Sequence, residues 1–123
     1  MNSTRAPLTE PGSACCTPLV GTAMSAAQAE QVVPLLKALA DPVRLRLVSL
    51  IASSPTGEAC VCDLNEAFDQ TQATISHHLK VLHSAGVLDR DKRGIWVYYA
   101  VRPEALDAVA DLFTTAARTG ASA

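Results

Sequence analysis

The stretch TQATISHHLKVLHSAG, residues 71–86, decides the fold of this chain. Thr71 is a good N-cap residue and Gly86 is typical of a helix end, so we expect a helix over 72–85. At about 100° per residue, one side of that helix is apolar and predicts a packed face, with Ile75, Leu79, Val81, Leu82 and Ala85. The opposite side carries amide, hydroxyl, imidazole and ammonium groups, from Gln72, Ser76, His77, Lys80 and His83.

The residues before this stretch predict further helices. Asp41-Pro42 combines an N-cap with proline at the first helical position, and it predicts a helix up to about Ser53. A short helix is expected over 62–68, so that it and the 72–85 helix form a helix-turn-helix. Ser25 and Gln28 resemble a capping box that begins a first helix towards Ala40, which Pro34 should kink or divide.

The residues after Gly86 predict a β-hairpin and one last helix. Val87–Asp91 and the β-branched, aromatic run Ile95–Val101 are expected to pair across a charged turn at 92–94, as the only β-structure. Pro103 then begins a helix to about Arg118. The fold class expected is mainly α with a β-hairpin wing, a winged helix-turn-helix of about five helices.

The polar face of the 72–85 helix favours nucleic acid as a partner. Side chains expected at or near base edges in a major groove are Gln72, Thr74, Ser76 and His77. Side chains expected on phosphates or in the minor groove are Lys80 and, from the hairpin, Arg90, Lys92 and Arg93. His78 falls within the apolar arc and is interpreted as a mostly buried structural residue. A merely solvated surface helix is the alternative, and the basic hairpin argues against it.

Length and composition limit the class of protein. The 123 residues allow one domain, and a 49% hydrophobic composition is enough for a packed core. We expect a flexible arm over 1–24, a DNA-binding and dimerisation domain over 25–118 and a tail over 119–123. No apolar run is long enough for a membrane span, and Met1–Pro18 lacks the apolar core of a secretory signal, so a cytoplasmic protein is expected. The net charge of −2 argues weakly against DNA, because local charge matters more than the sum.

The four cysteines form two close pairs, Cys15-Cys16 in the arm and Cys60-Val61-Cys62. In a reducing compartment, such pairs indicate soft-metal ligands or redox thiols rather than disulfides. Cys60 and Cys62 can converge if Cys60 precedes a helix and Cys62 begins it, and a helix N-terminus is expected to lower the pKa of the thiol. The alternative, small apolar filling, is disfavoured by the pairing of all four.

Three segments together are similar to one known family. LADPVRL (39–45), EACVCDL (58–64) and TISHHLKVL (74–82) with Ala85-Gly86 resemble the ArsR/SmtB family of metal-sensing repressors, in order and at the family's spacing. The resemblance implies a homodimeric winged-helix protein that binds double-stranded operator DNA and leaves it when metal binds. It implies a metal site at Cys15, Cys16, Cys60 and Cys62.

The resemblance leaves the metal open. Cys-Val-Cys is similar to the site of arsenic repressors and of cadmium/lead sensors, and the vicinal pair favours trivalent arsenic or antimony, which bind three thiolates. Cadmium or lead would use all four. The family's zinc site on the last helix needs histidine, which is absent there; Glu104, Asp107 and Asp111 are interpreted as a solvated face.

The last helix also bears on assembly and on competing functions. Its apolar arc, from Ala105 to Phe113, is broader than one small domain needs, and with 32–39 it predicts a dimer interface. A thiol redox switch on the same scaffold remains an alternative. An enzyme is disfavoured, because no Cys-x-x-Cys appears and neither His77 nor His83 has an acidic residue to orient it.

Overall fold

The computed structural model describes residues 18–114, which form two compact units. One is Leu35–Arg102, and the other comprises the described parts of Met1–Pro34 and Pro103–Ala123. Among residues 18–114, no helix has the length and apolar character to cross a bilayer. Predictions about Cys15, Cys16, most of the 1–24 arm and the 119–123 tail lie outside the described residues.

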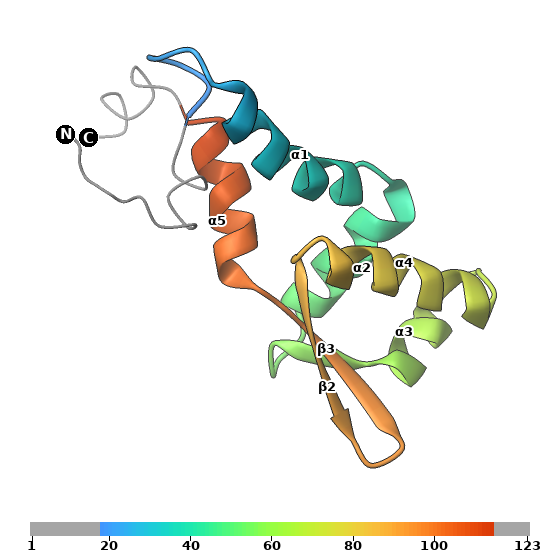
Figure 1. Ribbon diagram of the computed structural model, residues 1–123. Coiled ribbons are helices and arrows are strands. Elements are labelled where there is room, and N and C mark those ends of the chain that lie inside the picture. The colour runs from blue at the N-terminus through green and yellow to red at the C-terminus, as the bar shows by residue number, and fades with distance from the viewer. Residues whose placement is uncertain (1–17, 115–123) are drawn as a thin grey trace. The chain divides into compact units, whose positions relative to one another are not determined.

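The unit Leu35–Arg102 is a winged helix-turn-helix (Figure 1). Its elements, listed in chain order, are α2 (Pro42–Ala52), β1 (Glu58–Cys60), α3 (Val61–Ala67), α4 (Gln72–Ser84), β2 (Leu88–Arg93) and β3 (Trp96–Val101). α3 packs against α4, and both helices belong to the helix-turn-helix. The strands form an antiparallel sheet in the order β1-β3-β2, so β3 lies in the middle.

Local capping chemistry sets the helix boundaries as the sequence predicts. The Asp41 carboxylate accepts hydrogen bonds from the backbone N–H of Val43 at 2.9 Å and of Arg44 at 3.1 Å. These donors, that of Arg44 first, lower the pKa of the Asp41 carboxyl. Thr71 caps α4 through a 3.1 Å bond from the Thr74 N–H, and Gly86 follows its end with φ +87°.

The core of this unit is apolar and comes from every element. Its most deeply buried side chains are Leu47, Ile51, Leu64, Ile75, Leu79, Leu82, Val87 and Leu88. Leu45 and Leu50 of α2 lie outside this core, at 56% and 42% exposed. The predicted packed face of α4 is confirmed: Ile75, Leu79 and Leu82 are all buried.

Three strand predictions need correction. The hairpin is not the only β-structure, because Glu58–Cys60 adds β1 to the free edge of β3, with Cys60 opposite Tyr98. Lys92 and Arg93 lie within β2 instead of in the turn. The turn is the two-residue loop Gly94-Ile95, where Gly94 adopts φ +65°, a conformation that such tight hairpin loops require.

The other unit contains most of α1 (Ala26–Leu39) and α5 (Pro103–Leu112). The predicted capping box is confirmed, since the Ser25 N–H donates to Gln28 and the Gln28 N–H to Ser25, at 2.9 and 3.1 Å. Pro34 does not divide α1. α5 ends at Leu112, short of the predicted Arg118; after it, the N–H groups of Phe113 and Thr114 donate to carbonyls only three residues back, those of Ala110 and Asp111.

Candidate functional site

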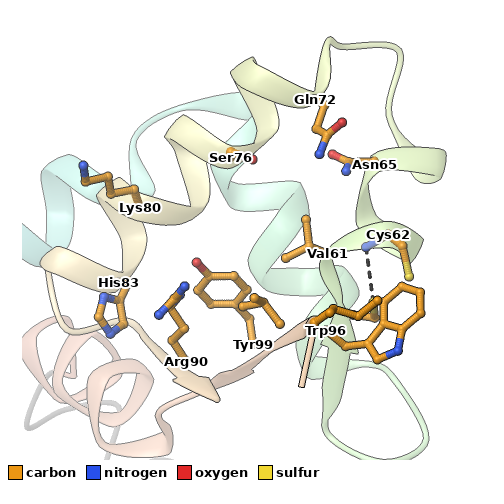
Figure 2. A pocket seen from close by; sticks show the side chains of 13 residues that line it. Val61, Cys62, Asn65, Gln72, Ser76, Lys80, His83, Arg90, Trp96 and Tyr99 are labelled. Carbon is orange, nitrogen blue, oxygen red and sulfur yellow. Dashed lines mark hydrogen bonds between the residues drawn. The ribbon is translucent and has the colours of Figure 1, made fainter. Parts of the chain in front are cut away.

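A concave surface of about 810 Å³ brings α4, the wing and the cysteine segment together within one unit (Figure 2). From α4 it is lined by Gln72, Ser76, Lys80 and His83, from β2 by Arg90, and from β3 by Trp96, Val97 and Tyr99. The junction of β1 and α3 contributes Cys60, Val61, Cys62 and Asn65. Side chains that suit nucleic acid therefore share one hollow with the two described thiols.

The helical spacing of α4 explains why its polar side chains face this hollow. Gln72, Ser76, Lys80 and His83 are separated by four, four and three residues, so they form one row on the surface of the helix. All four are exposed. Figure 2 shows Lys80 and His83 towards the end of the hollow where Arg90 also lies. Two cations and an imidazole at one end can hold a polyanion, while Gln72 and Ser76 offer hydrogen bonds further along.

Two predicted base contacts do not line the hollow. Thr74 is half-buried, and its hydroxyl accepts a hydrogen bond from the Thr71 hydroxyl at 2.8 Å, so it also helps to cap α4. His77 is exposed on α4 beside the ring of His78, with 5.8 Å between the ring centroids. Among the cations of the wing, Arg90 lines the hollow and Lys92 and Arg93 do not.

His78 is half-buried rather than mostly buried, and it binds a side chain that the sequence did not connect to it. Its Nδ1 lies 3.1 Å from Nη1 of Arg44 on α2. The same guanidinium donates from Nε to the Ala38 carbonyl at 2.7 Å. Arg44 thus links α2 to α4, which gives His78 a structural role, as expected.

Cys60 and Cys62 converge at the beginning of α3 in the arrangement predicted for them. Cys60 is the N-cap residue of α3, and its Sγ accepts a hydrogen bond from the Cys62 N–H at 3.3 Å. Cys60 is buried and Cys62 exposed, and neither forms a disulfide within residues 18–114. The expected lowering of thiol pKa is wrong for Cys62: a hydrogen bond between its side chain and that of Cys60, then burial, raises the pKa of its thiol above the ordinary value.

The described donors fall short of a complete metal site. Within residues 18–114, no three His, Cys, Asp or Glu side chains gather as a metal-binding group. Two thiols at one helix start are half of the predicted set, and the other two predicted ligands, Cys15 and Cys16, lie outside the described residues. Thiolates suit soft ions, so the pair fits arsenic, antimony, cadmium or lead better than magnesium or calcium.

Several lining residues of the hollow were not predicted from the sequence, among them Asn65, Trp96 and Tyr99. Asn65 lies one helical turn after Cys62, and its Oδ1 is buried with no hydrogen-bond partner in the described part of the chain. That spacing of three residues could have placed it beside the thiol. Trp96 and Tyr99 come from β3, whose side chains could be assigned to the hollow only with the strand pairing known.

Comparisons with known proteins identify the fold's relatives. A family model described as bacterial regulatory protein, arsR family, matches residues 41–90. A solved structure of a possible transcriptional regulator for arsenical resistance is 33% identical, with a TM-score of 0.59, and the alignment covers 73% of this chain and 96% of that one. The chain belongs to the ArsR family.

Other ArsR-type proteins extend this comparison. The arsenical resistance operon repressor of Escherichia coli K12 is 48% identical over 71 residues, 58% of this chain and 59% of that protein. A homolog of the cadmium resistance regulatory protein CadC from Staphylococcus aureus is 37% identical over 73 residues, 59% of each chain. This chain thus matches little more than half the length of these curated relatives. A solution structure of a homodimeric winged helix-turn-helix DNA-binding domain from Mycobacterium bovis is 29% identical, with a TM-score of 0.60, over 73% of this chain and 86% of that one.

Proposed function

We propose that this ArsR-family protein is a metal-responsive transcriptional repressor of the cytoplasm and not an enzyme. It binds double-stranded operator DNA as a homodimer and leaves it when trivalent arsenic or antimony binds its cysteines. The observation that carries this proposal is the single hollow shared by Cys60, Cys62 and the polar row of α4. A ligand on those thiols acts on the start of α3, which packs against α4.

The proposed DNA contacts follow the polar row and the wing. Gln72 and Ser76, with His77 and Thr74 near the start of the same helix, are proposed at base edges. Lys80, Arg90 and Lys92 are proposed on phosphates, with His83 beside them. Changing a base-edge residue such as Ser76 should alter the preference for operator over unrelated DNA, whereas neutralising a phosphate contact weakens binding to every sequence.

The proposed dimer is supported by apolar surface on the unit that holds α5. Leu106 and Phe113 are 37% and 56% exposed there, and Val33 of α1 is 36% exposed in the same unit. Exposed apolar side chains of this size are common at subunit interfaces. The homodimeric domain from Mycobacterium bovis supports the same assembly. Two-fold symmetry then calls for two operator half-sites, about one helical turn or a multiple apart.

The proposed soft-metal site uses Cys15, Cys16, Cys60 and Cys62. Arsenic and antimony bind three thiolates, so the Cys60/Cys62 pair needs at least one thiol from the 1–24 arm. The arsenical repressor of Escherichia coli supports this choice of inducer. Cadmium or lead on all four thiolates is the second candidate, favoured by the cadmium regulator homolog from Staphylococcus aureus.

The test is release of labelled operator DNA by arsenite, antimonite, cadmium, lead and zinc under strong reductant, repeated for each Cys→Ser variant. The proposal expects release by arsenite or antimonite. Cys15→Ser and Cys16→Ser should each lose release and keep DNA binding, and one change at Cys60 or Cys62 should be tolerated. Loss of release at all four positions, with cadmium or lead the better inducer, would favour the second candidate. In a parallel assay without reductant, release by an oxidant together with no response to any of these metals would point to a redox switch and contradict both.

A further inference from the structure

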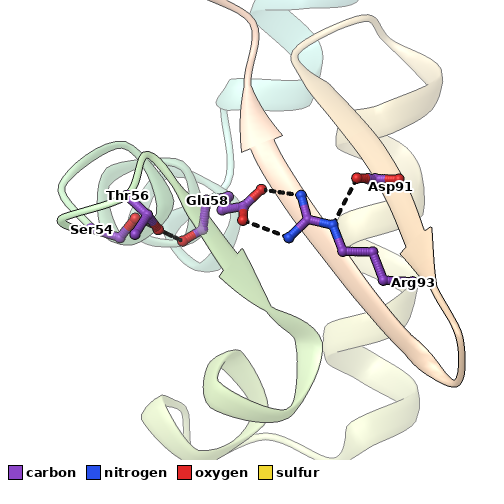
Figure 3. Close-up of polar contacts among 5 residues, drawn as sticks. All are labelled: Ser54, Thr56, Glu58, Asp91 and Arg93. Carbon is purple, nitrogen blue, oxygen red and sulfur yellow. Dashed lines mark hydrogen bonds and ion pairs between the residues drawn. The ribbon is translucent and has the colours of Figure 1, made fainter.

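The guanidinium of Arg93, at the end of β2, contacts three other side chains, and Figure 3 shows two of them, Glu58 and Asp91. It donates from Nη1 and Nη2 to the two carboxylate oxygens of Glu58, both at 2.8 Å. Its Nε donates to Asp91 at 2.8 Å, and its Cζ lies 4.4 Å from the centre of the Tyr98 ring. The hydrogen bond to Glu58, then that to Asp91, raises the pKa of Arg93 above its ordinary range. A two-pronged guanidinium–carboxylate pair fixes the geometry of its two partners more closely than a single hydrogen bond does.

This contact joins the wing to the cysteine segment across the sheet. The strand register places Cys60 of β1 opposite Tyr98 of β3, and Tyr98 opposite Asp91 of β2. Residues two apart on a strand share a face, so Glu58 and Arg93 lie on the same face as that row. Arg93 therefore spans β3 above Tyr98 and holds the residue two positions before Cys60. Glu58 and Arg93 are 35 residues apart in sequence.

The same alternation separates Arg93 from the other cations of the wing. Arg90 lines the hollow beside α4, and Lys92, two positions further, shares its face of β2. Arg93 lies on the opposite face, where its donors already bind two carboxylates. A phosphate contact by Arg93 would require it to leave Glu58 and Asp91. Arg90 and Lys92 are accordingly better placed than Arg93 to meet a phosphate.

We propose that the Arg93–Glu58 pair, here called the latch, couples ligand binding at Cys60 and Cys62 to the position of the wing. Arg93 is on this view a positioning residue for DNA release and not a DNA contact; the inference rests on the proposed function above. A ligand on Cys60 acts on the last residue of β1, and the latch couples that strand to the tip of β2. Without the latch, the thiols still bind their ligand, but the wing responds less.

The experiment uses the full chain with the single variants Glu58→Gln, Arg93→Lys and Asp89→Asn, the Glu58→Gln/Arg93→Lys double variant and, for the salt dependence, Arg93→Ala. Glu58→Gln removes one carboxylate of the latch, and Arg93→Lys keeps the charge of the wing but loses the two-pronged geometry. Asp89→Asn is the control, because it makes the same charge change as Glu58→Gln, lies on β2, and its contact with Arg102 is longer, at 3.7 Å. Thermal denaturation first verifies that each variant is folded.

Two measurements are made on each protein, with arsenite and separately with cadmium as probes. Trp96, the single tryptophan of the chain, lines the hollow with Cys60 and Cys62, so we expect its fluorescence to change when a probe binds the thiols. The ratio of operator affinity without and with the probe gives the coupling between thiols and DNA. We expect Glu58→Gln and Arg93→Lys to keep probe affinity and lower this ratio about fivefold or more, with the double variant no worse. Asp89→Asn should match the parent chain.

Amide hydrogen exchange of 88–101 in DNA-free protein separates failure of the latch from failure of the proposed function. The latch predicts that the probe changes exchange in the wing of the parent chain and changes it less in Glu58→Gln. Unchanged coupling in both latch variants, or probe binding that leaves wing exchange unaltered in the parent chain, overturns the latch. The latch is also overturned if Arg93→Ala lowers the salt dependence of DNA binding while Arg93→Lys keeps the parent's ratio of operator affinity without and with the probe. Arg93 would then be a phosphate contact. If the probe changes hydrogen exchange in the wing but never changes operator binding, the result contradicts the proposed function and not the latch.

Discussion

Neutralising Arg90 should change the salt dependence of operator binding by a predictable amount. Within residues 18–114 no carboxylate holds this side chain, and it lines the hollow at the end where Lys80 and His83 lie. If Arg90 contacts one phosphate in each subunit, Arg90→Gln removes two such contacts from a dimer. The slope of log K against log salt is about −0.9 for each phosphate, so it should become shallower by about 1.8. When salt rises from about 50 to 200 mM, both proteins lose affinity for the operator. The fall should be about twelvefold larger for the parent chain than for the variant.

The assay for this prediction is fluorescence anisotropy of labelled operator at several salt concentrations, repeated with unrelated DNA of equal length. The loss of affinity should be alike on both DNAs, because a phosphate contact carries no sequence information. Lys37→Gln is the control, since it removes one positive charge from an exposed position of α1. A slope that Arg90→Gln leaves unchanged, or that Lys37→Gln lowers equally, would refute the assignment of this end of the hollow to phosphate. A change of only about 0.9 would refute two equivalent subunits on the DNA.

Three further predictions concern stability and the thiols. Leu79→Ala removes a side chain that is only 1% exposed, so it should lower the free energy of unfolding by about 2–5 kcal/mol and Tm by about 10 °C or more. Leu45→Ala, at a side chain that is 56% exposed, should change Tm little. Gly86→Ala should cost about 1–2 kcal/mol in thermal or urea unfolding, because φ is +87° there and no neighbouring atom would clash; Gly86→Asn should cost less. The raised pKa of Cys62 favours the protonated thiol, and a soft ion must displace that proton to bind. Apparent cadmium affinity, read from Trp96 fluorescence, should rise by up to about tenfold per pH unit from about pH 6 to 9, and Cys62→Ser should flatten that rise.

Features set by a few neighbouring residues were predictable from sequence. The beginning and end of α4 follow from Thr71 and Gly86, because a cap and a left-handed glycine act within one helical turn. Asp41 fixes the start of α2 in the same way. The convergence of Cys60 and Cys62 also follows from local chemistry, since a residue at the N-cap position can reach the N–H two residues on.

Features set by pairing between distant residues were not predictable. β1 has only three residues, Glu58–Cys60, and nothing in their pattern indicates a strand; they become one because β3 leaves an edge free. The partner of Arg93 is likewise decided by register, because Glu58 lies two strands away in the sheet. A cluster of cations in sequence therefore gave no indication that one of them is already neutralised by carboxylates.

The position of Cys60 provides two routes by which a thiol ligand can act on DNA binding. Cys60 is the N-cap of α3, which packs against α4, and it is also the last residue of β1, which pairs with β3 of the wing. The first route moves the base-reading helix, and the second moves the phosphate-binding wing. Loss of base contacts reduces specificity, whereas loss of phosphate contacts reduces affinity for all DNA. If arsenite lowers affinity for operator and unrelated DNA equally in the parent chain, the wing route dominates; a loss confined to operator assigns release to α3 and α4. Because the Arg93–Glu58 pair belongs only to the second route, Glu58→Gln should diminish the loss on unrelated DNA and preserve the operator-specific part.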